Sequence, residues 1–244
     1  MRLLVTRPEP DALKLQAVLE NMGHEATVEP LLQVHFESTD TIELDGVQAL
    51  IATSRNGLRA LRGTAILARA RTLPLFTVGK ATAAEARALG FEMVVTGAGT
   101  ARKLVAQIVS VVDPAAGLMA HLAGDMLAVN LKRELEPHGF RVVEFLVYRM
   151  QAISALAPEV VEQLALGEID GVILLSARTA SVYARLVREH GLADCVRRLP
   201  HFCLSAAVAR RLERLGLVAV LSADRPRLEE VLALIDDSAA QSGD

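Results

Sequence analysis

The sequence has few of the aromatic side chains that proteins use to stack on bases or sugars. None of its 244 residues is tryptophan, two are tyrosine and six are phenylalanine. It also lacks long apolar runs, because the longest, such as residues 172–175, are far shorter than the roughly 18 residues of a membrane span. Near the N-terminus, Arg7 and Pro8 end an apolar stretch that is too short for the core of a secretory signal. We therefore expect a cytoplasmic protein.

Cysteine and excess charge of either sign are also scarce. The two cysteines, Cys195 and Cys203, form no CxxC pattern, so we predict reduced, packed thiols and no disulfide or zinc site. Twenty-six basic against 29 acidic residues give a net charge of −3 without a polybasic run. This balance argues against a nucleic-acid-binding surface held by phosphate contacts. Because 52% of the residues are hydrophobic, the chain can bury sizeable cores.

Several common catalytic motifs are missing. The sequence contains neither GxGxxG after a strand nor GxxxxGK[ST], so a nucleotide cofactor has no standard cradle, and GxSxG and HExxH are absent too. The histidines lack the spacing of metal ligands, and we predict them at surfaces or helix ends. These residues are His24, His35, His121, His138, His190 and His201. We therefore expect no metal site and no nucleotide cofactor.

Short apolar runs alternate with helical patterns, which is typical of βα units in a parallel sheet. Residues 3–6 form the first predicted strand, and the apolar period that follows stops at Gly23 in the position after a helix end. Further buried strands are predicted at residues 50–52, 75–78, 118–122, 172–175 and 202–204. The sequence therefore predicts an α/β fold. The small, polar residues 236–244 are predicted to form a frayed tail.

An internal repeat divides the chain into two similar parts. Residues 75–91 overlay residues 201–217, with Phe76 matching Phe202 at a constant offset. Upstream, Ser54 matches Ser176 at a slightly different offset. Two further segments, residues 30–37 and 141–149, look extended and lack a strong helix start. We infer two similar α/β lobes joined by these connectors.

Small or hydroxyl residues accompanied by a cation follow four of the predicted strands. At this edge of a parallel sheet, helix N-termini offer free N–H groups to anions. One interpretation is that Ser54, Thr100 and Ser176 are ordinary N-caps beside solvated charges. The recurrence favours the other interpretation, a site for carboxylates or phosphates. The four segments are Thr6-Arg7, Thr53-Ser54-Arg55-Asn56-Gly57, Gly79-Lys80-Ala81-Thr82 and Ser176-Ala177-Arg178-Thr179.

Taken in order, eight short strings resemble the uroporphyrinogen-III synthase family from Met1 to about Ile235. They are Thr6-Arg7-Pro8, Gly23-His24, Pro30-Leu31-Leu32, Thr53-Ser54-Arg55-Asn56-Gly57, Val78-Gly79-Lys80-Ala81-Thr82-Ala83, Ala123-Gly124-Asp125, Val147-Tyr148-Arg149 and Leu175-Ser176. The resemblance implies two parallel-sheet, flavodoxin-like lobes joined by a two-stranded extended link. The first lobe would comprise residues 1–32 plus 153–244 and the second residues 39–140, with connectors at 33–38 and 141–152.

The resemblance also implies an activity, the cyclisation of hydroxymethylbilane to uroporphyrinogen III. In this hydro-lyase reaction of tetrapyrrole and haem biosynthesis, the terminal pyrrole ring is inverted and water is lost, without a metal or organic cofactor. The substrate carries eight carboxylates, which suits cationic strand ends on a weakly negative chain. The expected protein is a cytoplasmic monomer that contacts porphobilinogen deaminase transiently and binds neither nucleic acid nor membrane.

Tyr148 matches the family's tyrosine on the second connector, and a phenol there can donate a proton to the leaving hydroxyl. A tyrosine on a half-buried strand can equally be a packing residue. The expected substrate-binding residues are Arg7, Thr53, Ser54, Lys80, Thr82, Ser176 and Ser205.

Two strand ends depart from the family pattern. Residues 204–206 read Leu-Ser-Ala where the family often has Gly-Pro-Thr, and Met126-Leu127 stand where basic residues are common. The alternative function is a bilobal anion-binding or regulatory module without catalysis, because two lobes on paired connectors would serve it equally well.

Overall fold

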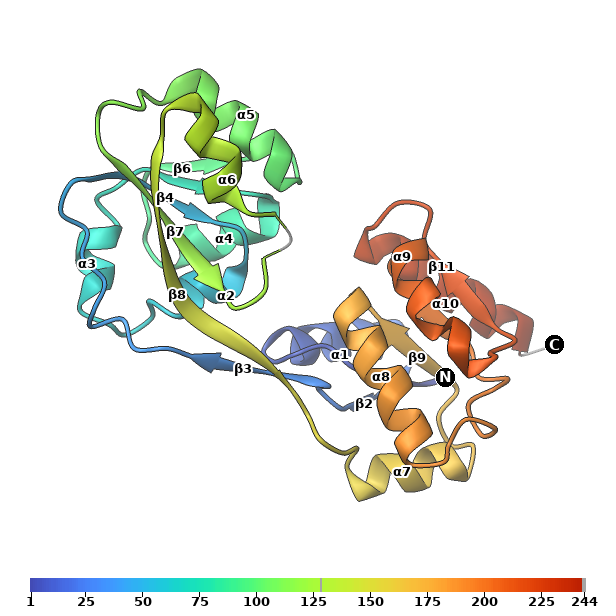
Figure 1. Cartoon of the computed structure of the whole chain (residues 1–244). Helices are drawn as coiled ribbons and strands as arrows, with labels where there is room; N and C mark the ends of the chain where they lie inside the picture. The colour runs from blue at the N-terminus through green and yellow to red at the C-terminus, as the bar shows by residue number, and fades with distance from the viewer. Residues whose placement is uncertain (128, 243–244) are drawn as a thin grey trace. The chain divides into compact units, whose positions relative to one another are not determined.

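The computed structural model describes residues 1–127 and 129–242 (Figure 1). Strands and helices alternate along most of the chain, as the sequence predicts. The strands are β1 (Arg2–Val5), β2 (Glu25–Val28), β3 (Leu32–Phe36), β4 (Val47–Ala52), β5 (Leu75–Thr77), β6 (Val94–Thr96), β7 (Leu118–Gly124), β8 (Arg141–Ala152), β9 (Gly171–Leu174), β10 (His201–Cys203) and β11 (Val220–Ser222). The helices are α1 (Asp11–Asn21), α2 (Arg55–Arg59), α3 (Ile66–Ala70), α4 (Lys80–Ala88), α5 (Ala101–Val111), α6 (Leu131–Leu135), α7 (Pro158–Ala165), α8 (Ala177–Glu189), α9 (Ala206–Ala209) and α10 (Leu228–Ser242), with 3₁₀ turns η1 (Glu136–His138) and η2 (Arg210–Leu215).

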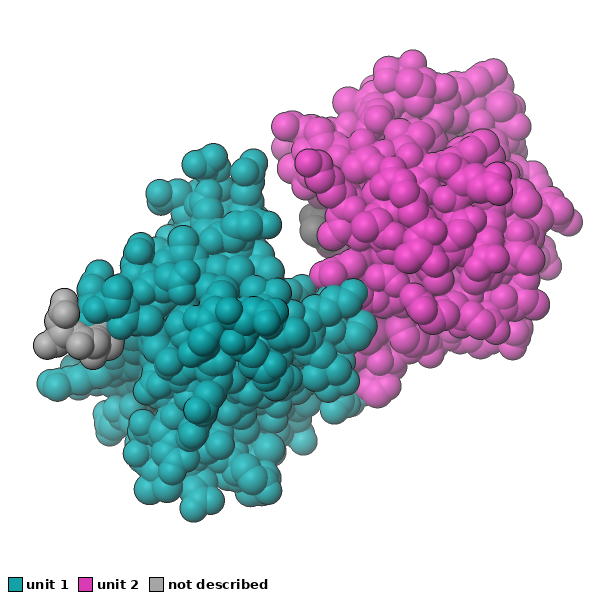
Figure 2. Space-filling view, turned by 180° about the vertical axis from the view of Figure 1, so that it is seen from behind, with its two compact units in different colours: residues 1–33, 151–244 teal, residues 34–150 magenta. Residues whose placement is uncertain are grey.

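The chain forms two compact units, which Figure 2 distinguishes by colour. Unit 1 comprises Met1–Gln33 and Gln151–Asp244, and unit 2 comprises Val34–Met150. Within the described residues, the sheet of unit 1 has five strands and the sheet of unit 2 has six. The α/β fold with two largely parallel sheets is therefore as the sequence predicts.

The sheet of unit 1 has the strand order β11-β10-β9-β1-β2, and every pairing is parallel. Alternate strand residues point to opposite faces. One face packs against α1 and α10, where Leu3 and Val5 meet Leu15, Val231 and Ile235. The other face is contacted by α8, whose first turn follows the end of β9. Helices on both faces explain why strands β1 and β9 read as nearly continuous apolar runs.

The sheet of unit 2 has the order β3-β8-β7-β4-β5-β6. Its two faces carry separate cores. On one face, α2, α3 and α4 cover residues that include Leu50, Leu122 and Tyr148. On the other face, α5 and α6 cover Ile51 and Met119. Strand β8, the long yellow-green strand of Figure 1, pairs with β7 along most of its length and lies between β7 and β3.

The strands of the two sheets have the same spatial order, but they follow one another differently along the chain. Strands β2-β1-β9-β10-β11 of unit 1 correspond to β8-β7-β4-β5-β6 of unit 2. In unit 1 this is the 2-1-3-4-5 order of flavodoxin-like folds. In unit 2 the equivalents of β1 and β2 come last in the chain rather than first. This permutation explains why the repeat aligns β5 with β10 and β4 with β9 but does not continue upstream to β1.

Three predictions about polar segments are wrong. Of the predicted tail 236–244, residues 236–242 continue α10 instead of fraying, since apolar residues such as Ile235 anchor that helix to the sheet, and residues 243–244 lie outside the described part of the chain. His121 and His201 are buried within strands β7 and β10, whereas His24, also buried, follows the end of α1 as predicted. Cys195 is exposed, and only Cys203 is packed.

None of the helices in residues 1–127 and 129–242 combines the length and apolar character that a membrane crossing needs.

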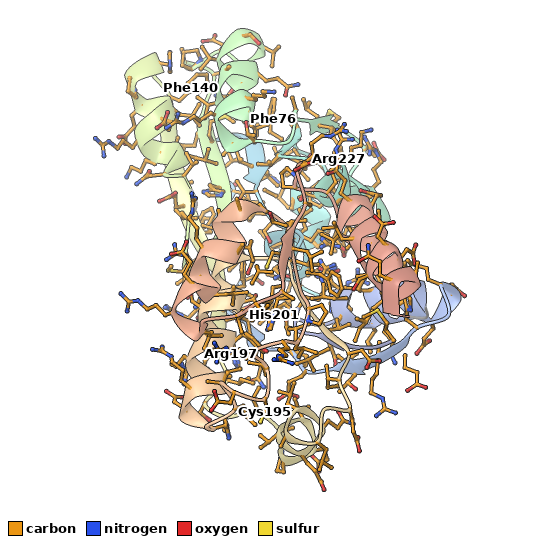
Figure 3. All side chains as sticks on the ribbon, turned by 90° about the vertical axis from the view of Figure 1, so that its right-hand side faces the viewer. Phe76, Phe140, Cys195, Arg197, His201 and Arg227 are labelled. Carbon is orange, nitrogen blue, oxygen red and sulfur yellow. The ribbon has the colours of Figure 1, made fainter. Side chains whose placement is uncertain are left out.

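His201, labelled in Figure 3, forms a buried polar pair with Tyr183. Its Nδ1–H donates to the carbonyl oxygen of Leu199 over 2.7 Å, so the neutral ring offers Nε2 to the Tyr183 hydroxyl at 3.0 Å. Burial lowers the pKa of His201 from 6.5 to about 4, although the backbone contact opposes the shift. The folded state therefore disfavours the charged ring.

We expect this pair to make the folding stability depend on acid. Unfolded His201 gains its proton near pH 6.5, and folded His201 only near pH 4. The contribution of the neutral ring to the free energy of unfolding is therefore complete above pH 6.5 and is lost as the pH falls to 4. The loss is about 3 kcal/mol. Urea unfolding followed by tyrosine fluorescence measures it in the Tyr148→Phe background, where Tyr183 is the remaining tyrosine. Adding His201→Phe should flatten this part of the profile, and parallel profiles would contradict the assignment.

Candidate active-site edges

The carboxyl ends of parallel strands meet at one edge of each sheet. In open α/β sheets, ligands bind at this edge, next to the point where the strand order reverses. That point lies between β4 and β7 in unit 2 and between β1 and β9 in unit 1. Five predicted site residues lie along the edge of unit 2, namely Thr53, Ser54, Lys80, Thr82 and Tyr148. Three lie along the edge of unit 1, namely Arg7, Ser176 and Ser205.

At the reversal point of unit 2, Thr53 and Ser54 follow β4 directly. The Ser54 hydroxyl accepts the backbone N–H of Asn56 over 3.2 Å and caps α2, as the N-cap interpretation predicts. Thr53 instead contacts the neighbouring strand, with its hydroxyl oxygen 3.4 Å from Nε2 of His121. The other ring nitrogen of His121 lies 3.2 Å from the Glu144 carboxylate on β8. The adjacent residues Thr53 and Ser54 thus have different partners.

Tyr148 lies over Gly124, at the same edge. A β-bulge places it there: Leu146 pairs with Ala123 and Tyr148 with Gly124, so Val147 is an extra residue on β8. Both Val147 and Tyr148 therefore pack on the face covered by α2 and α4. Tyr148 is 9% exposed, and a Cβ built on Gly124 would lie 2.4 Å from the ring. A glycine is needed here because the ring approaches the backbone closely.

Asp125 fixes the backbone on both sides of Arg149. Its N–H donates to the carbonyl oxygen of Tyr148 over 3.2 Å, and its carboxylate accepts the N–H of Met150 over 3.1 Å. The sequence showed Asp125 only as part of the Ala123-Gly124-Asp125 string. The structure adds that this residue holds β8 at the position of Tyr148.

Lys80 and Thr82 begin α4, beyond the end of β5. Gly79 occupies the N-cap position and offers no side chain to the first N–H groups of the helix, while Lys80 is exposed beside them. Thr82 is only 7% exposed, because it is on the side of α4 that packs against the sheet. Of these two predicted substrate-binding residues, Lys80 is exposed to solvent and Thr82 is buried.

Helices α2 and α4 are joined by a partly buried ion-pair cluster. The Glu85 carboxylate accepts hydrogen bonds from Arg59 over 3.3 Å and from Arg62 over 3.1 Å. Arg59 also donates to the side-chain oxygen of Asn56 over 3.0 Å. The cluster thereby ties the helix that follows Thr53 to the helix that begins at Lys80. Neither charge spacing nor periodicity in the sequence signals this contact.

At the edge of unit 1, three polar side chains pair with groups of the same unit. At the reversal point, the buried Thr6 hydroxyl donates to the carbonyl oxygen of Ile173 over 2.7 Å. Arg7 forms an ion pair with Asp11 at 3.5 Å, so its charge has a partner within the unit. Ser176 caps α8 by accepting the N–H of Thr179 over 3.0 Å. Ser205 begins α9 and its side chain makes no capping bond.

No motif in the sequence indicates a role for His121, Glu144 or Glu85. Their partners lie on other strands or helices, and a single sequence does not show such pairings. Among residues 1–127 and 129–242, no group of three or more His, Cys, Asp or Glu side chains is arranged to hold a metal ion.

Comparison with known proteins identifies the family. Residues 14–233 match the family model described as uroporphyrinogen-III synthase HemD. The uroporphyrinogen-III synthetase of Helicobacter pylori 26695 is similar in structure, with a TM-score of 0.66 at 15% identity, over 97% of this chain and 98% of that chain. A mutant uroporphyrinogen III synthase from the extremely thermophilic bacterium Thermus thermophilus has a TM-score of 0.56 at 18% identity, over 99% of both chains. No curated protein matches the sequence closely enough to count as a relative.

These structural similarities show the fold, which agrees with the two parallel sheets described above. The family match covers most of the sequence, from within α1 to within α10. The resemblance carried by the short sequence strings is therefore confirmed, and the chain belongs to the uroporphyrinogen-III synthase HemD family.

Proposed function

We propose that this protein cyclises hydroxymethylbilane to uroporphyrinogen III with inversion of the terminal pyrrole ring and loss of one water molecule. The observation that carries the proposal is the family match over residues 14–233. The edge of unit 2 supports it, because the predicted acid and the predicted binding residues Thr53 and Lys80 lie along one sheet edge. This is also the edge at which ligands bind in open α/β sheets.

In this proposal Tyr148 assists the departure of the hydroxyl group. Its phenol donates a proton as the carbon–oxygen bond breaks, so the hydroxyl leaves as water and the bilane becomes an azafulvene cation. The substituted carbon of the terminal ring then attacks to give a spiro intermediate, whose rearrangement inverts that ring, and the loss of one proton from the ring system balances the proton that Tyr148 donated. The packing of Tyr148 against Gly124 and the backbone contacts of Asp125 support this role, because they hold the phenol in one place.

The substrate carboxylates need donors and positive charge. Lys80 is exposed at the start of α4, where backbone N–H groups also point out of the helix. We propose that this helix end binds one carboxylate. Ser54 and Ser176 contribute mainly as N-caps that fix the starts of their helices. Arg7 supplies a weaker attraction than a solvated arginine would, because Asp11 already pairs with it.

A coupled assay tests the activity. Porphobilinogen deaminase supplied with porphobilinogen produces hydroxymethylbilane, which closes without inversion to the type I isomer when no synthase acts on it. Adding this protein should convert most of the product to isomer III, as measured by chromatography of the oxidised porphyrins. Product that remains isomer I at every protein concentration would contradict the proposal and favour a binding module without catalysis.

A further inference from the structure

His121 is a fully buried histidine that connects three adjacent strands of unit 2. It lies on β7, between β4 and β8, and is 0% exposed. In the sheet it stands opposite Ile51 on one side and Glu144 on the other. Its side chain can therefore reach both neighbouring strands, and it contacts Glu144 and Thr53. A histidine in this place has two polar partners and no access to solvent.

The direction of each hydrogen bond follows from the chemistry of the partners. An ionised carboxylate only accepts hydrogen bonds, so the His121 nitrogen beside Glu144, Nδ1, carries the hydrogen. Burial lowers the pKa of His121, although the contact with Glu144 opposes the shift. A pKa below its ordinary value favours the neutral ring at pH 7, in which Nε2 has a lone pair but no hydrogen. The Thr53 hydroxyl, 3.4 Å away, must be the donor in that contact.

This direction determines what Thr53 can offer to a ligand. A hydroxyl group has one hydrogen and two lone pairs. Because the Thr53 hydrogen points to His121, only lone pairs remain at the partly exposed tip of β4. A carboxylate has no hydrogen to give to these lone pairs. A pyrrole N–H, by contrast, is a donor.

We propose that Thr53 accepts a hydrogen bond from a pyrrole N–H of the substrate, and that His121 and Glu144 are positioning residues that fix its hydroxyl for this purpose. The proposal rests on the proposed function for the identity of the substrate. It differs from the sequence-based expectation that Thr53 contributes to carboxylate binding. Recognition of a pyrrole N–H bears directly on the reaction, because the orientation of a pyrrole ring decides which isomer forms.

Nitrogen NMR of His121 tests the direction of the hydrogen bonds without substrate. Protein labelled with ¹⁵N at histidine should show His121 as a neutral ring with its hydrogen on Nδ1 at pH 7. The His121→Phe spectrum assigns the signal by its disappearance. A ring that is charged at pH 7, or that carries its hydrogen on Nε2, would overturn the proposal.

Two conservative variants separate the two contacts. In His121→Gln the side-chain amide reaches the place of Nε2 and its oxygen can accept from Thr53. In His121→Asn the amide reaches the place of Nδ1 and preserves the donor to Glu144 only. In the coupled isomer assay we expect kcat/KM to fall about tenfold in His121→Asn, as the loss of one hydrogen bond implies, and to stay within about threefold in His121→Gln. A larger loss in His121→Gln than in His121→Asn would overturn the proposal.

A double-mutant cycle asks whether His121 acts through Thr53. Thr53→Val should lower kcat/KM about tenfold in the native background and have little effect in His121→Asn, because the hydroxyl is then no longer positioned. Equal losses in both backgrounds would mean that His121 does not act through Thr53 and would overturn the positioning role. Thr77→Val, on the adjacent strand β5, is the matched control, because its buried hydroxyl donates to the carbonyl of Val95.

The experiments distinguish a failure of the pyrrole contact from a failure of the proposed activity. If the native protein produces no isomer III, both the activity and the pyrrole contact are wrong, and the NMR result still decides the direction of the His121 bonds. If the native protein is active but the cycle is additive, only the inference is wrong.

Discussion

Replacing Tyr148 by phenylalanine is expected to lower kcat by about 10²–10⁴-fold, the usual contribution of a positioned general acid. The ring still packs over Gly124, since phenylalanine keeps every carbon atom of the tyrosine ring. Substrate binding should therefore change little, and the loss should appear in kcat more than in KM. Initial rates in the coupled assay, with the fraction of isomer III measured at each substrate concentration, provide the test.

Tyr183→Phe is the matched control for Tyr148→Phe, because it removes the hydroxyl of the chain's other tyrosine. Tyr183 is buried in unit 1 beside His201, so its loss should lower stability while kcat stays within about twofold of the native value, because no catalytic group is lost. Gly124→Ala supplies a second check, since its Cβ requires the Tyr148 ring to move while the hydroxyl remains. A loss of only a few fold in Tyr148→Phe would contradict a proton-donor role and leave a packing role.

The α/β fold was predictable because its signals are local. Buried strands such as residues 50–52 and 172–175 read as continuous apolar runs, since helices cover both faces of each sheet. The repeat was visible for a similar reason, because equivalent strands and turns need similar residues. Residues 141–149, predicted as an extended connector, form most of strand β8, and their pairing with β7 is what the sequence did not show. The sequence did not indicate a strand inside the sheet, because β8 has fewer buried residues than β4 or β7.

The candidate site was predictable in part. The positions of Thr53, Lys80 and Ser176 at strand ends follow from the alternation of strands and helices. The roles of these residues depend on pairing between strands, which one sequence does not reveal. The bulge at Val147 sets the face on which Tyr148 packs, and the register of β7 with β8 brings His121 to Glu144. Both features depend on a register that neither strand specifies alone.

Removing the Glu85 carboxylate is expected to lower the stability of unit 2 by about 3–5 kcal/mol, the usual cost of removing one partner of a buried ion pair. The Arg59 side chain is only 8% exposed, and Glu85→Ala removes the carboxylate that it contacts between α2 and α4. The side-chain oxygen of Asn56, which also accepts from Arg59, is neutral and does not replace the charge of the carboxylate. Urea unfolding in the Tyr183→Phe background, followed by the fluorescence of Tyr148, reports on unit 2 alone.

Arg62→Ala is the matched control, because it removes the other arginine from the same carboxylate. The Arg62 side chain is 64% exposed, so water replaces its contact and the loss should be about 1 kcal/mol or less. Replacing both buried charges in Arg59→Met/Glu85→Leu should recover most of the stability lost in Glu85→Ala, because apolar side chains of similar volume then replace both members of the ion pair. Similar losses in Glu85→Ala and Arg62→Ala would show that the cluster behaves as a surface ion pair and does not hold α2 against α4.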